Sequence, residues 1–325
     1  KARTTVLETG GTTVCDFYIV NEKNIAGPHR LQITATGPDG KQLLSTTADC
    51  RLAGGETYGQ LLQSDVSIPV GTAHGHVKIE AQLLAGEQVV ATGHEQVYAI
   101  DYRSLKLPPG GAHLDRSGAA GRFLGAIEAD AKPFAPSLPA VPYIVVGRED
   151  PRRNPLVDDI LDRVKRDGTT LIVIYDAELW AAELARRGLV KFDGTMVLGR
   201  NWVGGSYFNL DHPLFTGLPK PGGLNWEYQY LQMQRQPRPG RSGLLLSGAQ
   251  AAAGCFNHHE PRLATAVGTI KHGAGTIILS TLPIHWYLDG VHPATAMPKR
   301  VLVNYIAYGS RPLRPATRPA TMPAP

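Results

Sequence analysis

The densest group of reactive side chains in this sequence comprises Cys255, His258, His259 and Glu260. A thiol beside imidazoles and a carboxylate could supply a nucleophile and its general base. Residues this close in sequence seldom point at one another, however, and catalytic triads are recognised by geometry and roles. We therefore keep these residues as candidate site residues and predict no catalytic residue among them.

A second candidate site is the turn at Asp176-Ala177. It follows the continuous apolar run Leu171–Tyr175 and precedes a helix in which Trp180 and Leu184 recur at helical spacing. Such a run between helices is typical of a parallel strand buried on both faces. The turn after it is where an α/β sheet places a nucleophile. Because Asp176 stands there, with neither Ser nor Cys, we predict a catalytically silent elbow whose Asp176 caps the helix.

Two further pairs, Asp211-His212 and His285-Trp286, are candidates for a crevice at the carboxyl ends of the strands. Aromatic faces can stack on sugar rings, and packing of an irregular insertion against the core is the alternative explanation. The possible sugar-contacting aromatic residues are Trp202, Tyr207, Trp226 and Trp286.

Two other motifs favour structural roles. Asn21-Glu22 matches the acid/base pair of many retaining glycosidases, but that role needs a barrel strand and a second carboxylate. At the end of a sandwich strand, Glu22 is predicted to be a turn residue. His74 and His76 face one side of a strand without a nearby third metal ligand, which favours surface histidines.

The three cysteines are Cys15, Cys50 and Cys255, and no two have CxxC spacing. Cys15 and Cys50 lie in strand-like segments and could form a disulfide in an exported protein, or remain two buried thiols. Cys255 is predicted at a loop or strand end. We expect neither a metal nor another cofactor.

Residues 1–103 alternate short strand-like runs with Gly/Pro turns, a spacing that predicts an immunoglobulin-like β-sandwich. Hairpin signals occur at Pro38-Asp39-Gly40 and Ala85-Gly86-Glu87. The predicted strands are Thr12–Val20, Arg30–Thr36, Lys41–Ala48, Val77–Leu84 and Glu87–Tyr98.

A Gly/Pro-rich linker is predicted over 104–121, and the period changes beyond it. Residues 122–310 contain the apolar strands FLGAI, YIVVG, LIVIY, TMVLG, LLLSG and TIILST, with helices at Asn154–Arg166 and Pro298–Tyr308. Strands alternating with helices predict a mostly parallel, flavodoxin-like, doubly wound α/β sheet. The fold class is therefore multidomain, β followed by α/β, with a Pro-rich disordered tail over 311–325.

Composition narrows the function classes. Of the residues, 42% are hydrophobic and 19% are charged. The net charge is +5, and the Lys and Arg residues are scattered along the sequence. Its densest basic cluster, Arg311, Arg314 and Arg318, lies in the tail, so nucleic-acid binding is not expected. No apolar stretch reaches the roughly 20 residues of a membrane span. Because the sequence opens at Lys1 without a Met, we expect a processed chain or a fragment.

Three segments carry a family resemblance. Residues 143–174 (YIVVGREDPRRNPLVDDILDRVKRDGTTLIVI) resemble the strand–helix–strand unit of class I glutamine amidotransferase-like domains, in their trehalose-utilisation-like branch. Residues 211–219 (DHPLFTGLP) and 273–309 resemble a His-Pro…Gly-Leu-Pro segment and the closing strand and helix of that branch. After an immunoglobulin-like sandwich, such a domain resembles the C-terminal region of bacterial, β-galactosidase-like glycoside hydrolases of family 2.

This resemblance implies a non-catalytic accessory or assembly region of a hydrolase that acts on β-glycosides. Its partners would be the catalytic barrel or another subunit, a carbohydrate, or a second copy of the chain, in the periplasm or outside the cell. Active amidotransferases carry Cys at the elbow, so Asp176 implies a degenerate amidotransferase-like site. The alternatives are a free-standing hydrolase with its site in the α/β crevice and a carbohydrate-binding subunit.

Overall fold

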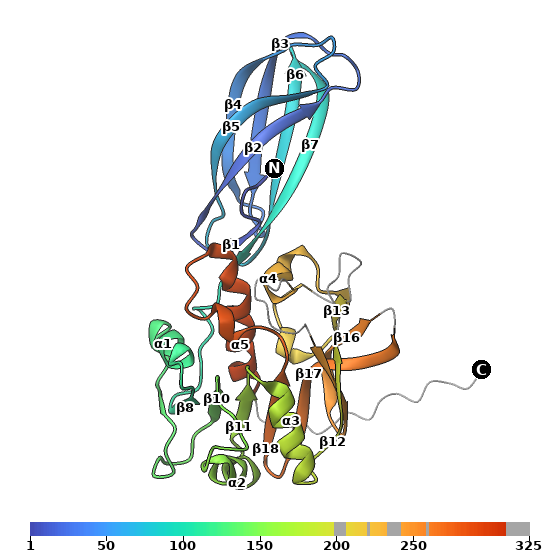
Figure 1. The fold of residues 1–325 in the computed structure, drawn as a ribbon. Coiled ribbons are helices and arrows are strands. Elements are labelled where there is room, and N and C mark those ends of the chain that lie inside the picture. Colours follow the sequence, from blue (N-terminus) through green and yellow to red (C-terminus); the bar gives the residue numbers. More distant parts are fainter. Residues whose placement is uncertain (198–205, 220–221, 233–241, 258–259, 310–325) are drawn as a thin grey trace, which may run out of the picture.

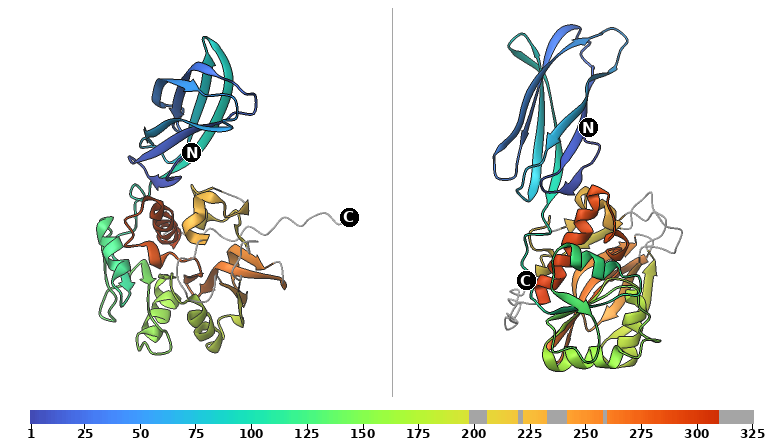
Figure 2. Two further views of the ribbon diagram at one scale, coloured as in Figure 1. Left: turned by 45° about the horizontal axis from the view of Figure 1, so that its top comes forward. Right: turned by 90° about the vertical axis from the view of Figure 1, so that its left-hand side faces the viewer.

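The computed structural model consists of an elongated all-β part followed by a rounder part in which a sheet is flanked by helices (Figure 1). It describes residues 1–197, 206–219, 222–232, 242–257 and 260–309. In both views of Figure 2 the all-β part projects from one end of the second part. The predicted tail over 311–325 lies outside the described residues.

The all-β part is a sandwich of two sheets. One sheet has the order β1-β7-β6-β3-β4, and the other pairs β2 with β5. Alternate side chains of β2, including Cys15 and Phe17, enter the core against Ile33 and Ile79 of the facing sheet. The strands are β1 (Val6–Glu8), β2 (Thr12–Val20), β3 (Gly27–Thr36), β4 (Gln42–Leu52), β5 (Gly59–Pro69), β6 (Gly75–Ala85) and β7 (Gln88–Ile100).

All five strands predicted for this part are present, and β1 and β5 were missed. In β5, apolar and polar residues do not alternate regularly. The pairing of β5 with β2 shifts register on both sides of Phe17, so a regular alternation is not required there. Asp65, within β5, also has a left-handed backbone with φ 58°. The hairpin predicted at Gly86 connects β6 to β7, and Gly86 has φ 61°.

The second part is built on a mixed sheet. Its five parallel strands follow the spatial order β9-β8-β10-β11-β18, which is 2-1-3-4-5 in chain order and is found in open doubly wound sheets. These strands are β8 (Gly111–Leu114), β9 (Ala131–Pro133), β10 (Tyr143–Val146), β11 (Thr170–Val173) and β18 (Gly275–Ser280).

An antiparallel extension continues the sheet beyond β18 through β17, β16, β13 and β14, with β15 and β12 branching from β17. The prediction of a mostly parallel sheet was therefore wrong for this region. The tight turn predicted at Gly273 and Gly275 reverses the chain between β17 and β18, so these neighbours cannot be parallel. The strands are β12 (Lys191–Val197), β13 (Ser206–Asn209), β14 (Gly222–Gly223), β15 (Ser242–Ser247), β16 (Gln250–Asn257) and β17 (Glu260–His272).

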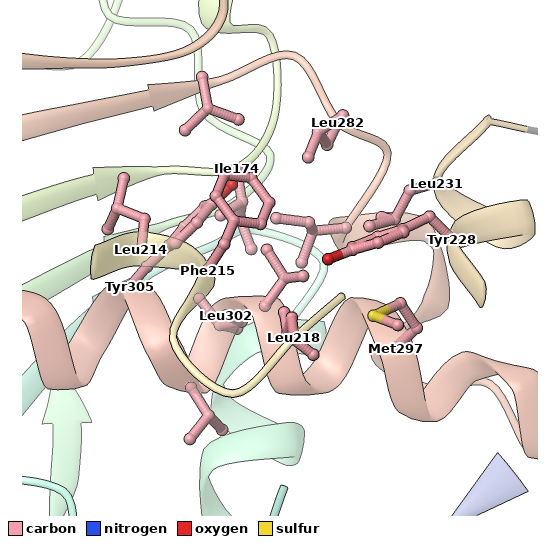
Figure 3. Packing of buried hydrophobic residues seen from close by; sticks show 14 of the residues in the cluster. Ile174, Leu214, Phe215, Leu218, Tyr228, Leu231, Leu282, Met297, Leu302 and Tyr305 are labelled. Carbon is pink, nitrogen blue, oxygen red and sulfur yellow. The ribbon is translucent and has the colours of Figure 1, made fainter. Parts of the chain in front are cut away.

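Helices cover both faces of the parallel strands. Neighbouring residues of β11 enter opposite clusters: Ile172 packs with α1 and α5, and Leu171 packs with α2 and α3. Figure 3 shows Leu302 and Tyr305 of α5 packing near Phe215 in the first cluster. The helices are α1 (Ala119–Ala126), α2 (Val157–Asp167), α3 (Ala177–Arg186), α4 (Gln229–Gln232) and α5 (Ala296–Gly309), with short 3-10 turns η1 (Pro213–Phe215), η2 (Trp226–Tyr228), η3 (His285–Tyr287) and η4 (Pro293–Thr295).

The structure corrects two predictions near residue 115. The linker predicted over 104–121 contains β8, which pairs with both β9 and β10 inside the sheet. The predicted strand FLGAI lies largely in α1, because Phe123 and Leu124 are buried together with Ala119 and Ala120 at helical spacing. The Gly/Pro content of the segment hid a four-residue strand and a short helix.

His74 and His76 contact the second part of the chain; His76 is exposed, as predicted, whereas His74 is half-buried and its prediction as a surface histidine was wrong. His74 accepts a hydrogen bond from the Asp101 N–H at Nδ1, and its Nε2 lies 2.5 Å from the Gly217 carbonyl oxygen. His76 Nε2 lies 3.0 Å from Glu227 Oε1. Arg300 of α5, only 7% exposed, donates to the Asp101 carbonyl.

Candidate functional site

Four adjacent parallel strands end at the same edge of the sheet, and the residues that follow them form the candidate site. Asp115 follows β8, Arg148 lies just beyond β10, Tyr175 lies just beyond β11, and His285 begins η3 after β18. The chain order of the strands reverses between β8 and β10. Such a switch point, at the carboxyl ends of the strands, is where open α/β sheets bind ligands.

The centre of this site is the Asp115 carboxylate, whose side chain is fully buried. Its Oδ1 accepts from the backbone N–H groups of Ser117 and Arg148, each at 3.0 Å, and from the Ser117 hydroxyl at 2.8 Å. Its Oδ2 accepts from the Ala120 N–H at 2.9 Å and lies 3.2 Å from His285 Nε2. Asp115 therefore ties the ends of β8, β10 and β18 together.

These donors determine the charge state of Asp115. Burial alone would raise the pKa of this carboxyl, but the hydrogen bonds from His285, Ala120, Arg148 and Ser117 hold its pKa well below the ordinary value. Asp115 also packs closely on the next strand end, since a Cβ at Gly147 would lie 2.4 Å from Asp115 Cγ. The carboxylate is thus ionised and fixed in position.

Ser117, His285 and Asp115 contain the residue types of a hydrolase triad but lack its geometry. In a triad, one histidine nitrogen faces the serine and the other faces the carboxylate. Here His285 Nε2 faces both, at 3.0 Å from Ser117 Oγ and 3.2 Å from Asp115 Oδ2. Nδ1 is buried, without a hydrogen-bond partner among the described residues. His285 therefore binds Asp115 and leaves no accessible nitrogen to act as a base.

Around Tyr175 lies the exposed part of the site. The Tyr175 ring centroid is 4.9 Å from that of His285 and 5.6 Å from that of Trp286, and the Arg148 guanidinium lies 6.0 Å from the same ring. Trp286 is 49% exposed. This cluster combines a cation with aromatic faces beside the fixed Asp115.

Asp176 occupies the elbow between β11 and α3. Its backbone is left-handed, with φ 48° and ψ 40°, in a conformation that Asp tolerates better than most residues. Asp176 holds the N-cap position of α3, as predicted, but its side chain makes no capping hydrogen bond. The predicted cap was wrong in this respect, because a left-handed N-cap departs from the extended backbone typical of capping residues.

The pair Asp211-His212 lies away from this edge. His212 is buried, and its Nδ1 accepts the Leu214 N–H as the N-cap of η1. Its ring lies 5.4 Å from that of Tyr308, in the last turn of α5. The next residue, Gly309, packs on Thr170 at the opposite, amino end of β11. His212 therefore caps a turn, and the prediction that it lines the crevice was wrong.

Cys255 is a core residue rather than a nucleophile. Cys255 belongs to β16 and pairs with Tyr207 of β13. Both side chains are buried in the core. Burial raises the pKa of Cys255 to about 12, so the thiolate is scarce at neutral pH. The candidate partners His258 and His259 lie outside the described residues, as does the side chain of Glu260.

The remaining predictions concern thiols and aromatic residues. Cys15 and Cys50 are both free, which excludes the disulfide alternative in this structure, and Cys50 is only half-buried. Trp226 packs against His76 at the junction of the two parts, with ring centroids 5.8 Å apart. Trp202 lies outside the described residues. With Tyr207 in the core, Trp286 is the predicted sugar-contacting residue best placed to meet a ligand.

Sequence reasoning missed Asp115 and Arg148. Each follows a short apolar strand, GAHL or YIVV, and a polar residue directly after a buried strand is the signal that could have found them. GAHL was obscured by its Pro/Gly-rich surroundings. Within the described ranges, no group of three or more His, Cys, Asp or Glu residues is arranged to hold a metal ion. The described helices are also too short or too polar to cross a membrane.

No family model matches this sequence, and a search of curated proteins finds no similar sequence. Partial matches exist among solved structures. Exo-β-1,4-mannosidase Op5Man5 from Opitutaceae bacterium strain TAV5 is 12% identical with a TM-score of 0.35, over 62% of this chain and 35% of that one. A glycosyl hydrolase family 2 member from Bacteroides cellulosilyticus is 13% identical with a TM-score of 0.26, over 53% and 23%.

A third match is Bacteroides uniformis β-glucuronidase 2, covalently bound to cyclophellitol-6-carboxylate aziridine. It is 14% identical with a TM-score of 0.26, over 53% of this chain and 22% of that one. The matches with these three proteins span between about a fifth and about a third of each neighbour's length. The chain is thus similar, at low identity and over part of its length, to structures of family 2 glycoside hydrolases.

Proposed function

We propose that this chain is a non-catalytic accessory region of a family 2-type glycoside hydrolase that acts on β-glycosides. Its second part is a class I glutamine amidotransferase-like domain whose site is degenerate. The observation that carries this proposal is the elbow after β11, which presents the carboxylate of Asp176 where an active amidotransferase presents a thiol. The 2-1-3-4-5 order of the parallel strands supports the same domain type.

The rest of the edge supports an inactive site. Asp115 is saturated with hydrogen bonds, and His285 uses the same nitrogen for Asp115 and Ser117. Cys255, in β16, is buried within the sheet. The described residues at this edge therefore offer neither an activated nucleophile nor a free base.

The sandwich also lacks the features of a glycosidase site. Asn21 bonds the backbone of Ile25 in both directions and closes the turn after β2. Glu22 accepts a hydrogen bond from the Tyr58 hydroxyl at 3.2 Å. Retaining hydrolysis needs two carboxyl groups about 5 Å apart on opposite sides of the glycosidic bond. The sandwich instead contacts the second part through His74 and His76, which supports a role in positioning that part.

Direct assays test this proposal. The purified chain is expected to turn over neither aryl β-galactosides, β-glucuronides and β-mannosides nor glutamine. In the complete hydrolase, Asp176→Asn and His285→Gln are expected to leave kcat/KM unchanged. Glycosidase activity of the isolated chain that disappears in Glu22→Gln would overturn the proposal. A hundredfold loss in folded Asp176→Asn would return the elbow to the active site.

A thiol installed at the elbow tests the amidotransferase-like assignment separately. In Asp176→Cys, with Cys50 replaced by Ser, the new thiol would stand at the N-terminus of α3, where thiol pKa values fall below the usual ~8.5. Its alkylation by iodoacetamide should therefore reach half-maximal rate at a lower pH than that of a control thiol, Asp162→Cys on the exposed face of α2. Matching pH profiles would argue against an elbow of the amidotransferase type.

A further inference from the structure

We propose that the edge of the sheet around Tyr175 binds a pyranose sugar that carries an anionic group, a carboxylate or a phosphate. Arg148 would pair with the anion, and Trp286 would stack on the sugar ring. This inference goes beyond the accessory role and does not depend on it, because it concerns ligand binding without turnover. Three independent features of the described residues support it.

The first feature is the exposed guanidinium of Arg148. Arg116 pairs with the buried Glu149 at 3.2 Å, and Arg152 pairs with Asp150 at 2.9 Å. Within the described part of the chain, the exposed Arg148 guanidinium has no carboxylate partner, and it lies over the Tyr175 ring, 6.0 Å from the ring centroid. A planar guanidinium with free donors is suited to a carboxylate or phosphate, which it can bind through two parallel hydrogen bonds.

The second feature is an aromatic surface directly beside that charge. Trp286 is 49% exposed although its ring lies 5.6 Å from Tyr175, the same ring that Arg148 covers. A large exposed indole that is held by a neighbouring ring offers a flat apolar face with little further ordering cost. The apolar face of a pyranose matches such a surface, whereas a small inorganic anion would leave it unused.

The third feature is the location. Arg148 stands at the switch point between β8 and β10, where open α/β sheets bind their ligands. Its backbone is fixed there, because the Arg148 N–H donates to the buried Asp115 at 3.0 Å. The Asp115 carboxylate is fully buried and enclosed by its own hydrogen-bond donors, so a ligand at the surface would not contact it directly. The cation and the indole are thus held on a rigid support.

Isothermal titration calorimetry of the chain with four probes tests the proposal: glucuronate, glucose 6-phosphate, glucose and inorganic phosphate. At least one anionic sugar is expected to bind with a Kd of about 1 mM or tighter, and at least about tenfold more tightly than glucose. The stronger of the two identifies a carboxylate or a phosphate as the preferred anion. Binding should weaken as salt is raised, because the Arg148 pair is exposed.

Variants separate the two contacts. Arg148→Gln should lower affinity for the anionic sugar about tenfold or more, to the level of glucose, and Arg148→Lys should recover part of it. Trp286→Ala should abolish binding of every sugar. The control is Arg166→Gln, on the exposed surface of α2, which should bind like the parent chain. Far-ultraviolet circular dichroism and thermal melts verify that each variant is folded.

Three results would overturn the proposal. One is the absence of binding to either anionic sugar at about 10 mM. A second is equal affinity for glucose and for the anionic sugars. A third is inorganic phosphate binding as tightly as glucose 6-phosphate and unaffected by Trp286→Ala, which would reveal an unspecific anion site. None of these results bears on the catalytic assays, so the failure of either proposal is recognised separately.

Discussion

Replacing Asp115 by Asn tests whether this carboxylate holds the edge of the sheet together. The substitution keeps the size of the side chain and removes its charge. The two carboxylate oxygens now accept from the N–H groups of Ser117, Arg148 and Ala120 and from the Ser117 hydroxyl. Asn offers one acceptor oxygen, and its NH2 group would face at least one of these donors.

The expected cost follows from the two effects together. A buried N–H without an acceptor costs about 1–3 kcal/mol, and hydrogen bonds to a charged acceptor contribute about 1.5–3 kcal/mol each. Removing one member of a buried ion pair costs about 3–5 kcal/mol, which is an upper bound for losing the contact between Asp115 and His285. We therefore expect Asp115→Asn to lower the free energy of unfolding by about 3 kcal/mol.

Urea unfolding at a series of pH values measures this difference. Because the folded-state pKa of Asp115 is lowered, its stabilisation is complete above the unfolded pKa of about 3.9 and is lost as pH falls through the folded value. The gap between the parent chain and Asp115→Asn should be widest at neutral pH and should narrow below about pH 4. Hydrogen exchange should show the amides of Ser117, Ala120 and Arg148 losing protection.

The matched control is Asp162→Asn on α2. Its side chain is 63% exposed and pairs with Arg166 at 3.3 Å, so the loss should be at most about 0.5 kcal/mol. A difference below about 1 kcal/mol for Asp115→Asn would refute the reasoning, as would a difference that does not change with pH. Either result would mean that the buried hydrogen bonds to Asp115 contribute little to stability.

Three other predictions follow from the geometry around the site and the core. Gly147→Ala should destabilise the chain by at least about 2 kcal/mol in thermal melts, because its Cβ would lie 2.4 Å from Asp115 Cγ. A thiol-reactive dye at pH 8 should label Cys50 in the native chain and reach Cys255, whose pKa burial raises to about 12, only after denaturation. At the left-handed position of Asp176, Asn should be neutral in chemical unfolding and Ala should cost about 1 kcal/mol.

The sequence pattern predicted the elements that are buried on both faces. LIVIY and TIILST are β11 and β18, and the apolar spacing in 154–166 marks α2 within a few residues. A strand covered by helices has no polar face, so its composition identifies it without tertiary information. The antiparallel extension differs because β16 and β17 alternate irregularly across several register shifts, which depend on pairing rather than on either strand alone.

The candidate site was only partly predictable for a related reason. His285, Trp286 and Asp176 were selected because each is chemically conspicuous or follows a long apolar run. Asp115 and Arg148 follow strands of four residues, and nothing local distinguishes them from the other acidic and basic residues of this chain. Asp115 and Arg148 come together only because β8 lies between β9 and β10 in the sheet. The pairing of β8 with β9 joins segments on either side of α1.

Burial also explains why several reactive residue types proved structural. Cys255, Tyr207 and His212 carry groups that could do chemistry, but each is less than 10% exposed and packs within an element or caps one. The residue type determines which reactions a side chain can undergo in water. The fold determines whether a substrate can reach that side chain. At the carboxyl edge the same distinction separates the enclosed Asp115 from the exposed Arg148 and Trp286. Arg148 and Trp286 are therefore the side chains of this cluster that a ligand could contact.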